Sequence, residues 1–228
     1  LFPRPAARLT AWAAVPSMEQ AVALLSLAQR SLGADLTGFE GMGRFALQVG
    51  DKHRPQLRVP FIDRPEVQWG VLLENSDNES EEHARARFEA LLEAAFEAGF
   101  VSDAVVAENI AQAQQLWHIR ESIPLAQAQE GLNIKHDISV PISRIPAFVA
   151  DTDARLAREI PGVRLVNFGH LGDGNLHYNV QAPEGSESLA FLATHEAAIN
   201  RIVYDAVQAA GGSFSAEHGI GALKVEKL

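Results

Sequence analysis

Residues 167–179 read NFGHLGDGNLHYN, and in them alternating apolar residues precede and follow the pair Asp173-Gly174. An Asp-Gly pair between two such segments is the strongest short signal for a β-hairpin, because both central residues of a type I′ turn need positive φ angles. With this pair at the turn, His170 lies opposite His177 on the neighbouring strand. Cross-strand partners share a face of the sheet, with Cβ atoms about 5 Å apart. The pattern therefore predicts two imidazoles side by side.

A second segment, SAEHGIGALK at residues 215–224, places an acid and a base next to two glycines. Two histidines and one carboxylate are a common ligand set for a divalent metal, with positions left open for substrate. Glu217 is therefore the candidate third ligand beside His170 and His177. His218 points to the other side if the backbone is extended there, which makes it a candidate general base.

Two further segments, WHIRE at residues 117–121 and KHDISVP at residues 135–141, carry the positive charges of interest. On an alternating strand Lys135 lies on the polar face, whereas His136 falls among apolar residues and is predicted to be a packed histidine. Arg120 lies on the helix that precedes this strand. Together Arg120 and Lys135 provide the local positive charge that an anionic ligand would require.

Each of these candidate sites has a plainer structural interpretation. His170 and His177 can be a stacked cross-strand pair without a metal. Glu217 can cap a turn, with the adjacent glycines needed only for backbone shape. Arg120 and Lys135 can be ordinary surface charges, since most exposed arginines and lysines are.

The first half of the chain predicts the element order βαββαβ, which is the ferredoxin-like unit. Helical spacing of apolar residues ends at Gly33 and again at Gly99. Residues 41–65, with three prolines and several charges, give no regular pattern. The strands and helices are predicted, in chain order, at residues 10–15, 21–32, 36–40, 67–74, 84–95 and 104–107.

The second half repeats the same element order after a linking helix, although no sequence repeat relates the two halves. The sequence therefore predicts an α+β fold, in which two ferredoxin-like halves form a mainly antiparallel sheet flanked by helices. The whole chain, residues 1–228, is expected to be one domain with halves at 1–107 and 134–228 and a linker at 108–133. The later elements are predicted at residues 109–129, 134–141, 143–156, 163–169, 175–181, 199–206 and 212–215.

Composition restricts the possible partners of the chain. Its 228 residues are 47% hydrophobic and 21% charged, which is typical of a globular protein with a real core. The formal net charge of −10 disfavours nucleic acid and anionic membranes as partners. No apolar run approaches the roughly 18 residues of a membrane span, and no signal segment opens the chain. The absence of cysteine excludes disulfides and thiolate metal sites, and a cytoplasmic location is expected.

Three motifs of this sequence resemble those of one known family. They are G-H-x-G-D-G-N-L-H-x-N at residues 169–179, E-H-G-I-G-x-x-K at residues 217–224, and R-E followed by K-x-D-I-S-V-P within residues 120–141. Together they resemble the C-terminal domain of FAD-linked oxidases and dehydrogenases. That family includes the glycolate oxidase flavoprotein subunit, D-lactate dehydrogenases and D-2-hydroxyglutarate dehydrogenases. The resemblance is weaker before Trp117 and strong after it.

The resemblance implies roles for the histidines and for the glutamate of these motifs. In metal-dependent members of the family, the two hairpin histidines and the tail glutamate hold a divalent metal, zinc or manganese. Those roles fall on His170, His177 and Glu217. The histidine that follows the glutamate is the family's proposed general base, and this role falls on His218.

The resemblance also implies a substrate site. Arg120 and Lys135 would bind the substrate carboxylate, and Asn179, on the same face as the hairpin histidines, would line the site. This sequence departs from the family pattern at Pro124, where some hydroxyglutarate dehydrogenases carry a hydroxyl, which makes a dicarboxylate substrate doubtful. It also stops at Leu228, before the family's closing helix.

The implied function is FAD-dependent oxidation of a D-2-hydroxy acid to a 2-oxo acid. No dinucleotide-binding fingerprint is present, so the FAD is expected on a preceding domain of the same polypeptide. The chain by itself is therefore predicted to bind metal and to be catalytically inactive. A quinone, an electron-transfer flavoprotein or an iron–sulfur subunit would be the electron acceptor.

Two other classes of function fit the same residues. Two histidines and a carboxylate also suit a flavin-free metal-dependent hydrolase or a non-haem iron enzyme. A non-catalytic docking module with a relict site is the third alternative. Activity with Fe(II) and oxygen alone would favour the iron enzyme, and absence of bound metal would favour the docking module.

Overall fold

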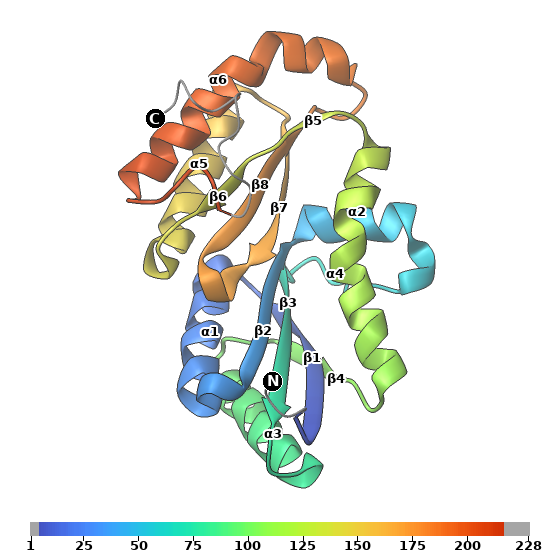
Figure 1. Ribbon diagram of the computed structural model, residues 1–228. Coiled ribbons are helices and arrows are strands. Elements are labelled where there is room, and N and C mark those ends of the chain that lie inside the picture. Colours follow the sequence, from blue (N-terminus) through green and yellow to red (C-terminus); the bar gives the residue numbers. More distant parts are fainter. Residues whose placement is uncertain (1–4, 217–228) are drawn as a thin grey trace.

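The computed structural model describes residues 5–216 of the chain. Within these residues one eight-stranded sheet forms, and every strand pairs antiparallel with its neighbours (Figure 1). The strand order is β4-β1-β3-β2-β7-β8-β5, and β6 also pairs with β8. The predicted α+β class and the mainly antiparallel sheet are confirmed.

The first half is a ferredoxin-like unit whose strands lie in the order β4-β1-β3-β2. Apolar side chains at helical spacing between Ala21 and Leu32 bury one face of its first helix, as the sequence predicts. The elements are β1 (Ala7–Val15), α1 (Met18–Leu32), β2 (Leu36–Gly43), α2 (Arg44–His53), β3 (Trp69–Asp77), α3 (Glu81–Glu97) and β4 (Asp103–Val106), with short 3₁₀ turns η1 (Gly33–Asp35) and η2 (Pro55–Leu57).

The second half repeats the unit after the linking helix. Asn109 caps that helix, because its side chain accepts a hydrogen bond from the backbone N–H of Gln112 at 3.0 Å. The elements are α4 (Ile110–Glu130), β5 (Asn133–Ile134), β6 (Asp137–Ser139), α5 (Ile145–Glu159), β7 (Arg164–His170), β8 (Asn175–Gln181) and α6 (Ser188–Ala209), with 3₁₀ turns η3 (Ile142–Arg144) and η4 (Leu171–Asp173).

The strands β2 and β7 join the two halves into one sheet. Each is the outer strand of its own half, and they pair antiparallel with Glu40 opposite His170 and Met42 opposite Phe168. We call this the β2–β7 junction. It brings residues separated by 130 positions in the chain into direct contact.

The two faces of the sheet are covered differently (Figure 1). Helices α1, α3, α5 and α6 contribute to the larger hydrophobic core on one face. On the other face α2 and α4 pack over a smaller core that includes Trp12, Met42 and Phe168. We call this second face the α4 face. Because strand side chains alternate, Glu40, His170 and His177 lie on the α4 face too.

Helix α2 lies where the sequence predicts no regular structure, so the prediction for residues 41–65 is wrong in this part. Ala46 and Leu47 are buried in the smaller core against α4 and the sheet, and Val49 is buried too. An isolated helix of ten residues is marginal in water, and tertiary packing supplies its stability. Its apolar residues lie on one side and its charged residues on the other, which is the amphipathic pattern that the sequence prediction missed.

The predicted hairpin register is also wrong. His177 lies opposite Phe168, not opposite His170, and Asp173 belongs to the 3₁₀ turn η4. The reason is Leu171, which is fully buried in the larger core and leaves the strand ladder to reach it. Of the Asp173-Gly174 pair, only Gly174 has a positive φ, of 74°. The register differs by two residues, so both histidines keep the same face but lie on a diagonal.

Two predicted strands are shorter in the structure. The strand predicted at 134–141 is divided into β5 and β6. At the break, the backbone N–H of His136 donates a hydrogen bond to the side-chain oxygen of Asn179 at 3.2 Å, and not to a backbone oxygen of the neighbouring strand. The strand predicted at 212–215 is reduced to one bridge between Ser139 and Ser213. In residues 5–216 no helix combines the length and apolar character needed to cross a membrane.

Candidate functional site

The centre of the candidate site is Glu40, a residue that the sequence analysis did not select. It lies on β2 at the β2–β7 junction and is 3% exposed. One carboxylate oxygen accepts a hydrogen bond from Nε of Arg120 at 2.7 Å. The other contacts Nδ1 of His170 in a short hydrogen bond. Glu40 therefore joins the predicted substrate-binding arginine to a predicted metal ligand.

The charges around Glu40 keep it ionised. Burial alone raises the pKa of this carboxyl group, but the hydrogen bond from His170 and the charge of Arg120 outweigh burial and hold the pKa below its ordinary value. Arg120 is itself 8% exposed, so it is no ordinary surface charge. A buried guanidinium and a buried carboxylate at 2.7 Å form a paired site in which neither charge is left uncompensated.

Phe168 lies between the arginine and the second histidine. The guanidinium carbon of Arg120 lies 4.9 Å from the centre of its ring, which is a cation–π contact. The ring of His177 lies 4.8 Å from the same ring, centre to centre. Phe168 is 3% exposed, and its position opposite His177 on the neighbouring strand explains both contacts.

His177 also contacts a carboxylate. Asp137 on β6 lies directly opposite it in the strand pairing, and Nδ1 of His177 is 3.8 Å from Oδ1 of Asp137. The side chain of Asp137 is 12% exposed and that of His177 is 23% exposed. Nδ1 of His170 is thus hydrogen-bonded to a buried carboxylate, whereas Nδ1 of His177 lies at ion-pair distance from Asp137, beyond hydrogen-bond range. The bond made by His170 is common among metal-binding histidines.

Asn179 lies deeper in the α4 face than the two histidines. It is 5% exposed, and its Nδ2 donates to Oε1 of Gln127 at 2.9 Å, while its oxygen accepts from the backbone of His136. Gln127 belongs to α4 and is 1% exposed. Both ends of the Asn179 amide are therefore held by the fold.

The structure places Lys135 in the break between β5 and β6, where it is exposed. Its neighbour His136 is fully buried, as predicted, and packs edge-on against Tyr204 with ring centres 5.3 Å apart. One ring nitrogen of His136 contacts the backbone oxygen of Tyr178 at 2.7 Å, and the other contacts Asn200 at 2.9 Å. His136 is a structural residue.

Glu217 and His218 lie outside the described residues, so the predicted third metal ligand and the predicted base stay predictions. Within residues 5–216 no three His, Cys, Asp or Glu side chains form a metal-binding group. The donor chemistry of His170 and His177 fits a divalent metal, because imidazole is a common ligand and a buried carboxylate bonds to Nδ1 of His170.

Three residues of the candidate site were not selected from the sequence, each for a different reason. Glu40 is a charged residue among apolar and glycine neighbours in the strand LTGFEGMG, a pattern that marks a buried charge with a partner. Phe168 lies two residues before His170, in the apolar strand that leads into the hairpin motif, and an apolar residue there is read as ordinary core. Gln127 left no signal, because α4 has no clear apolar stripe from which its buried side could be predicted.

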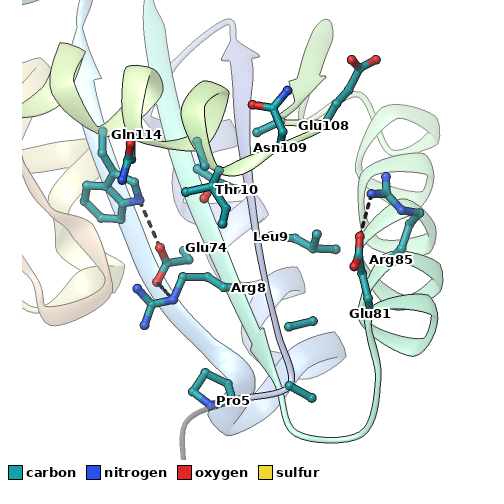
Figure 2. A pocket seen from close by; sticks show the side chains of 16 residues that line it. Pro5, Arg8, Leu9, Thr10, Glu74, Glu81, Arg85, Glu108, Asn109 and Gln114 are labelled. Carbon is teal, nitrogen blue, oxygen red and sulfur yellow. Dashed lines mark hydrogen bonds and ion pairs between the residues drawn. The ribbon is translucent and has the colours of Figure 1, made fainter.

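A pocket of about 480 Å³ lies beside the N-terminal half of α4 (Figure 2). Glu74 on β3 accepts a hydrogen bond from Nε1 of Trp117 at 3.1 Å and lies 3.5 Å from Nε of Arg8. Thr10 on β1 also lines the pocket. Glu74 and Glu40 thus have a similar arrangement. Each is a strand glutamate that accepts a hydrogen bond from a side chain of α4, Trp117 for Glu74 and Arg120, about one helical turn later, for Glu40.

A family model described as FAD linked oxidases, C-terminal domain, matches residues 4–228. The chain belongs to this family.

Curated relatives of this C-terminal domain include D-2-hydroxyglutarate dehydrogenases. The rat mitochondrial protein is 33% identical over 226 residues, which cover 99% of this chain and 40% of that protein. The protein of Xanthomonas citri pv. viticola is 43% identical over 152 residues, covering 67% of this chain and 31% of that protein. The chain thus spans about a third to two fifths of the length of these relatives.

Solved structures with the same fold include p-cresol methylhydroxylase with substrate bound, at a TM-score of 0.65 and 11% identity over 94% of this chain and 46% of that one. Alkyldihydroxyacetonephosphate synthase matches at a TM-score of 0.60 and 8% identity, over 93% of this chain and 40% of that one. At these identities the likeness concerns the fold alone.

Proposed function

We propose that this chain is the substrate-binding domain of a flavin-dependent dehydrogenase that oxidises a D-2-hydroxy acid to a 2-oxo acid. The observation that carries the proposal is the convergence on one sheet face of a buried cation and two histidines. Arg120 and His177 contact the same phenylalanine ring, and His170 shares a carboxylate with Arg120. Family membership of the chain supports the same reaction class.

In this proposal the residues of the chain bind the substrate and move one proton. Arg120 pairs with the substrate carboxylate, Lys135 adds a second positive charge, and Asn179 lines the site. His218 accepts the proton of the 2-hydroxyl group as the C2 hydrogen leaves. The fixed guanidinium orients the substrate, which lowers the entropy cost of reaching the reactive geometry.

His170, His177 and Glu217 would hold a divalent metal, zinc or manganese. Such a metal lowers the pKa of a hydroxyl group that it contacts, which makes proton transfer to a neutral imidazole feasible at neutral pH. Metal-binding histidines use a neutral ring nitrogen, and the carboxylate bonded to Nδ1 of His170 favours the tautomer with hydrogen on Nδ1.

The reaction also requires a hydride acceptor, which no protein side chain can be. FAD bound by another domain of the same polypeptide would be that acceptor, and the isolated chain is predicted to be inactive. A quinone, an electron-transfer flavoprotein or an iron–sulfur subunit would then reoxidise the flavin. The cytoplasmic location expected from composition stays a prediction.

Two observations bear on the substrate class in opposite directions. The curated relatives act, by their names, on D-2-hydroxyglutarate, a dicarboxylate. Pro124, one helical turn after Arg120, offers no hydrogen-bond donor for a second carboxylate. We therefore expect the enzyme to accept D-lactate, and a side-by-side comparison of kcat/KM for D-lactate and D-2-hydroxyglutarate tests this expectation.

The proposal is tested on the complete polypeptide that contains this chain, prepared without chelators. We expect bound zinc or manganese in the unmodified protein and little of either in His170→Ala or His177→Ala. His218→Ala should keep the metal but lower kcat by about 10²- to 10⁴-fold with an artificial electron acceptor. Activity that depends on Fe(II) and oxygen without flavin would support a non-haem iron enzyme instead. Absence of metal from every form, together with absence of turnover, would support a docking module.

A further inference from the structure

Glu40 is neither a proposed metal ligand nor a proposed substrate-binding residue, yet it bonds to one of each. Its two carboxylate oxygens are used by two different partners, Arg120 from α4 and His170 from β7. These partners come from the linking helix and from the second half of the fold, whereas Glu40 belongs to the first half. The β2–β7 junction places Glu40 directly opposite His170.

Stability alone does not explain this arrangement. Taking charges out of water is costly, and replacing a buried ion pair by apolar residues of similar volume is often neutral or stabilising. The side chains of Glu40 and Arg120 are 4% and 9% exposed. A buried pair of this kind is better explained by the specific geometry that it imposes on its members.

We propose that Glu40 is a positioning residue that sets the orientation of Arg120 and of His170 together. This inference rests on the proposed function, in which Arg120 binds the substrate carboxylate and His170 binds the metal. The inference adds Glu40 to the site, a residue of the first half of the chain that lies outside all three sequence motifs.

For Arg120, Glu40 and Phe168 together define the plane of the guanidinium group. The bond to Nε restrains the group in its plane, and the ring of Phe168, 4.9 Å from the guanidinium carbon, restrains it from one side. Glu40 bonds to Nε of Arg120, so this bond leaves the two terminal NH₂ groups of the guanidinium for another partner. Two parallel N–H donors are the geometry that a carboxylate accepts.

For His170, Glu40 determines the tautomer. A carboxylate at Nδ1 favours the hydrogen on that nitrogen, and the lone pair of the ring then lies on Nε2. A hydrogen-bonded carboxylate also makes the imidazole a more basic ligand. Loss of Glu40 therefore weakens metal binding without removing a metal ligand.

The test replaces Glu40 by glutamine in the complete polypeptide. An amide can accept a hydrogen bond from only one of the two partners and turns an N–H group toward the other. We expect Glu40→Gln to weaken Mn²⁺ binding by about 10- to 100-fold, as measured by competition with a chelator. KM for D-lactate should rise by about tenfold, because Arg120 loses its orientation.

Glu74→Gln is the matched control. Glu74 is also a mostly buried carboxylate on the α4 face, 8% exposed, and it accepts a hydrogen bond from a side chain of α4, Trp117. Within residues 5–216 its hydrogen-bond and ion-pair partners are Thr37, Trp117 and Arg8, and not Arg120 or His170. Its substitution should lower thermal stability to a similar extent while leaving Mn²⁺ affinity and KM unchanged.

A second variant covers the case in which Glu40→Gln does not fold. The double substitution Glu40→Leu with Arg120→Met replaces the buried pair by apolar side chains and should keep the fold. Its Mn²⁺ affinity should still fall by about 10- to 100-fold, because His170 has lost its carboxylate.

The outcomes separate this inference from the proposed function. If the unmodified protein binds Mn²⁺ and oxidises D-lactate while Glu40→Gln behaves like Glu74→Gln, the role of Glu40 is overturned and the proposed function stands. A folded double variant with unchanged Mn²⁺ affinity overturns it as well. If the unmodified protein binds no metal, the proposed function fails, and the inference fails with it.

Discussion

Asp153 and Glu40 are both shielded carboxylates, yet their pKa values move in opposite directions. Glu40 has a guanidinium and an imidazole as partners, so its pKa falls. Asp153 on α5 has only the hydroxyl of Tyr178, which donates at 2.5 Å. Burial raises the pKa of Asp153 to about 6, and the bond from Tyr178 only partly opposes this effect. Burial raises the pKa of both groups, and the positively charged partner and the imidazole of Glu40 reverse the shift for that residue alone.

The raised pKa of Asp153 predicts a specific pH dependence of stability. Between its ordinary pKa of 3.8 and about 6, the folded state binds the proton more tightly than the unfolded state, so stability falls as pH rises. Asp153→Asn removes this loss and keeps an oxygen acceptor for Tyr178. Between pH 4 and pH 7.5, the free energy of unfolding of the unmodified protein should fall by up to about 3 kcal/mol more than that of the variant.

Urea unfolding at pH 4 and at pH 7.5 measures this difference directly. Tyr178→Phe serves as the comparison, because it removes the bond that lowers the pKa of Asp153 and should steepen the pH dependence. Equal pH dependence in the unmodified protein and in Asp153→Asn would contradict the raised pKa.

At the scale of secondary structure, the β7–β8 hairpin sets the positions of both candidate metal-binding histidines. Leu171 leaves the ladder to enter the core, and Gly174 returns the chain to β8 with a φ of 74°. The oxygen of Gly174 accepts the backbone N–H of Val140 at 2.9 Å, which ties the turn to the residues after β6. The turn is therefore shaped by tertiary contacts as well as by its glycine.

Gly174→Ala should disrupt this hairpin. A Cβ atom there would lie 2.5 Å from the backbone oxygen of Val140, and the left-handed conformation adds its own cost. We expect the free energy of unfolding to fall by about 3 kcal/mol and metal binding to weaken. Gly185→Ala is the control, because Gly185 has the same φ of 74° but no atom within 4 Å of the added Cβ. Equal destabilisation by both substitutions would show that the contact with Val140 has no effect.

Elements with local patterns were predictable from the sequence, and those shaped by distant contacts were not. The order βαββαβ follows from residue periodicity, so α1, α3, α4 and most strands were predicted within a few residues. Helix α2 and the register of the hairpin depend on packing against α4 and on the burial of Leu171. Those contacts join segments that a local pattern does not relate.

At the scale of the whole molecule, Glu130 connects both halves at the end of α4. Its carboxylate contacts Lys52 and His53 of α2 at 2.8 Å and Arg164 of β7 at 2.6 Å. Burial alone raises the pKa of Glu130, but the hydrogen bonds from these three side chains lower it to about 2. The linking helix is thus fixed to the first half and to the second half through one carboxylate.

Glu130→Gln should weaken this connection in a pH-dependent way. The folded pKa lies below the ordinary value of 4.5, so the stabilisation is present above pH 4.5 and is lost as pH falls toward 2. At pH 7 we expect the variant to lose about 2 kcal/mol, a value reduced for the solvent exposure of Lys52. Glu159→Gln, which alters an exposed pair with Arg155, should stay close to the unmodified protein. A loss for Glu130→Gln that is the same at pH 3 and pH 7 would contradict this account.

The sequence by itself determined the fold class, the two repeated units and the face on which the hairpin histidines lie, because residue periodicity and strand alternation are local properties. It also contained the motifs of the FAD-linked oxidase C-terminal domain. Only the tertiary structure revealed Glu40 between Arg120 and His170, and Phe168 between Arg120 and His177. Those contacts arise where β2 meets β7 and where α4 crosses the sheet, and the free energy of burying charges in pairs depends on which distant residues the fold brings together.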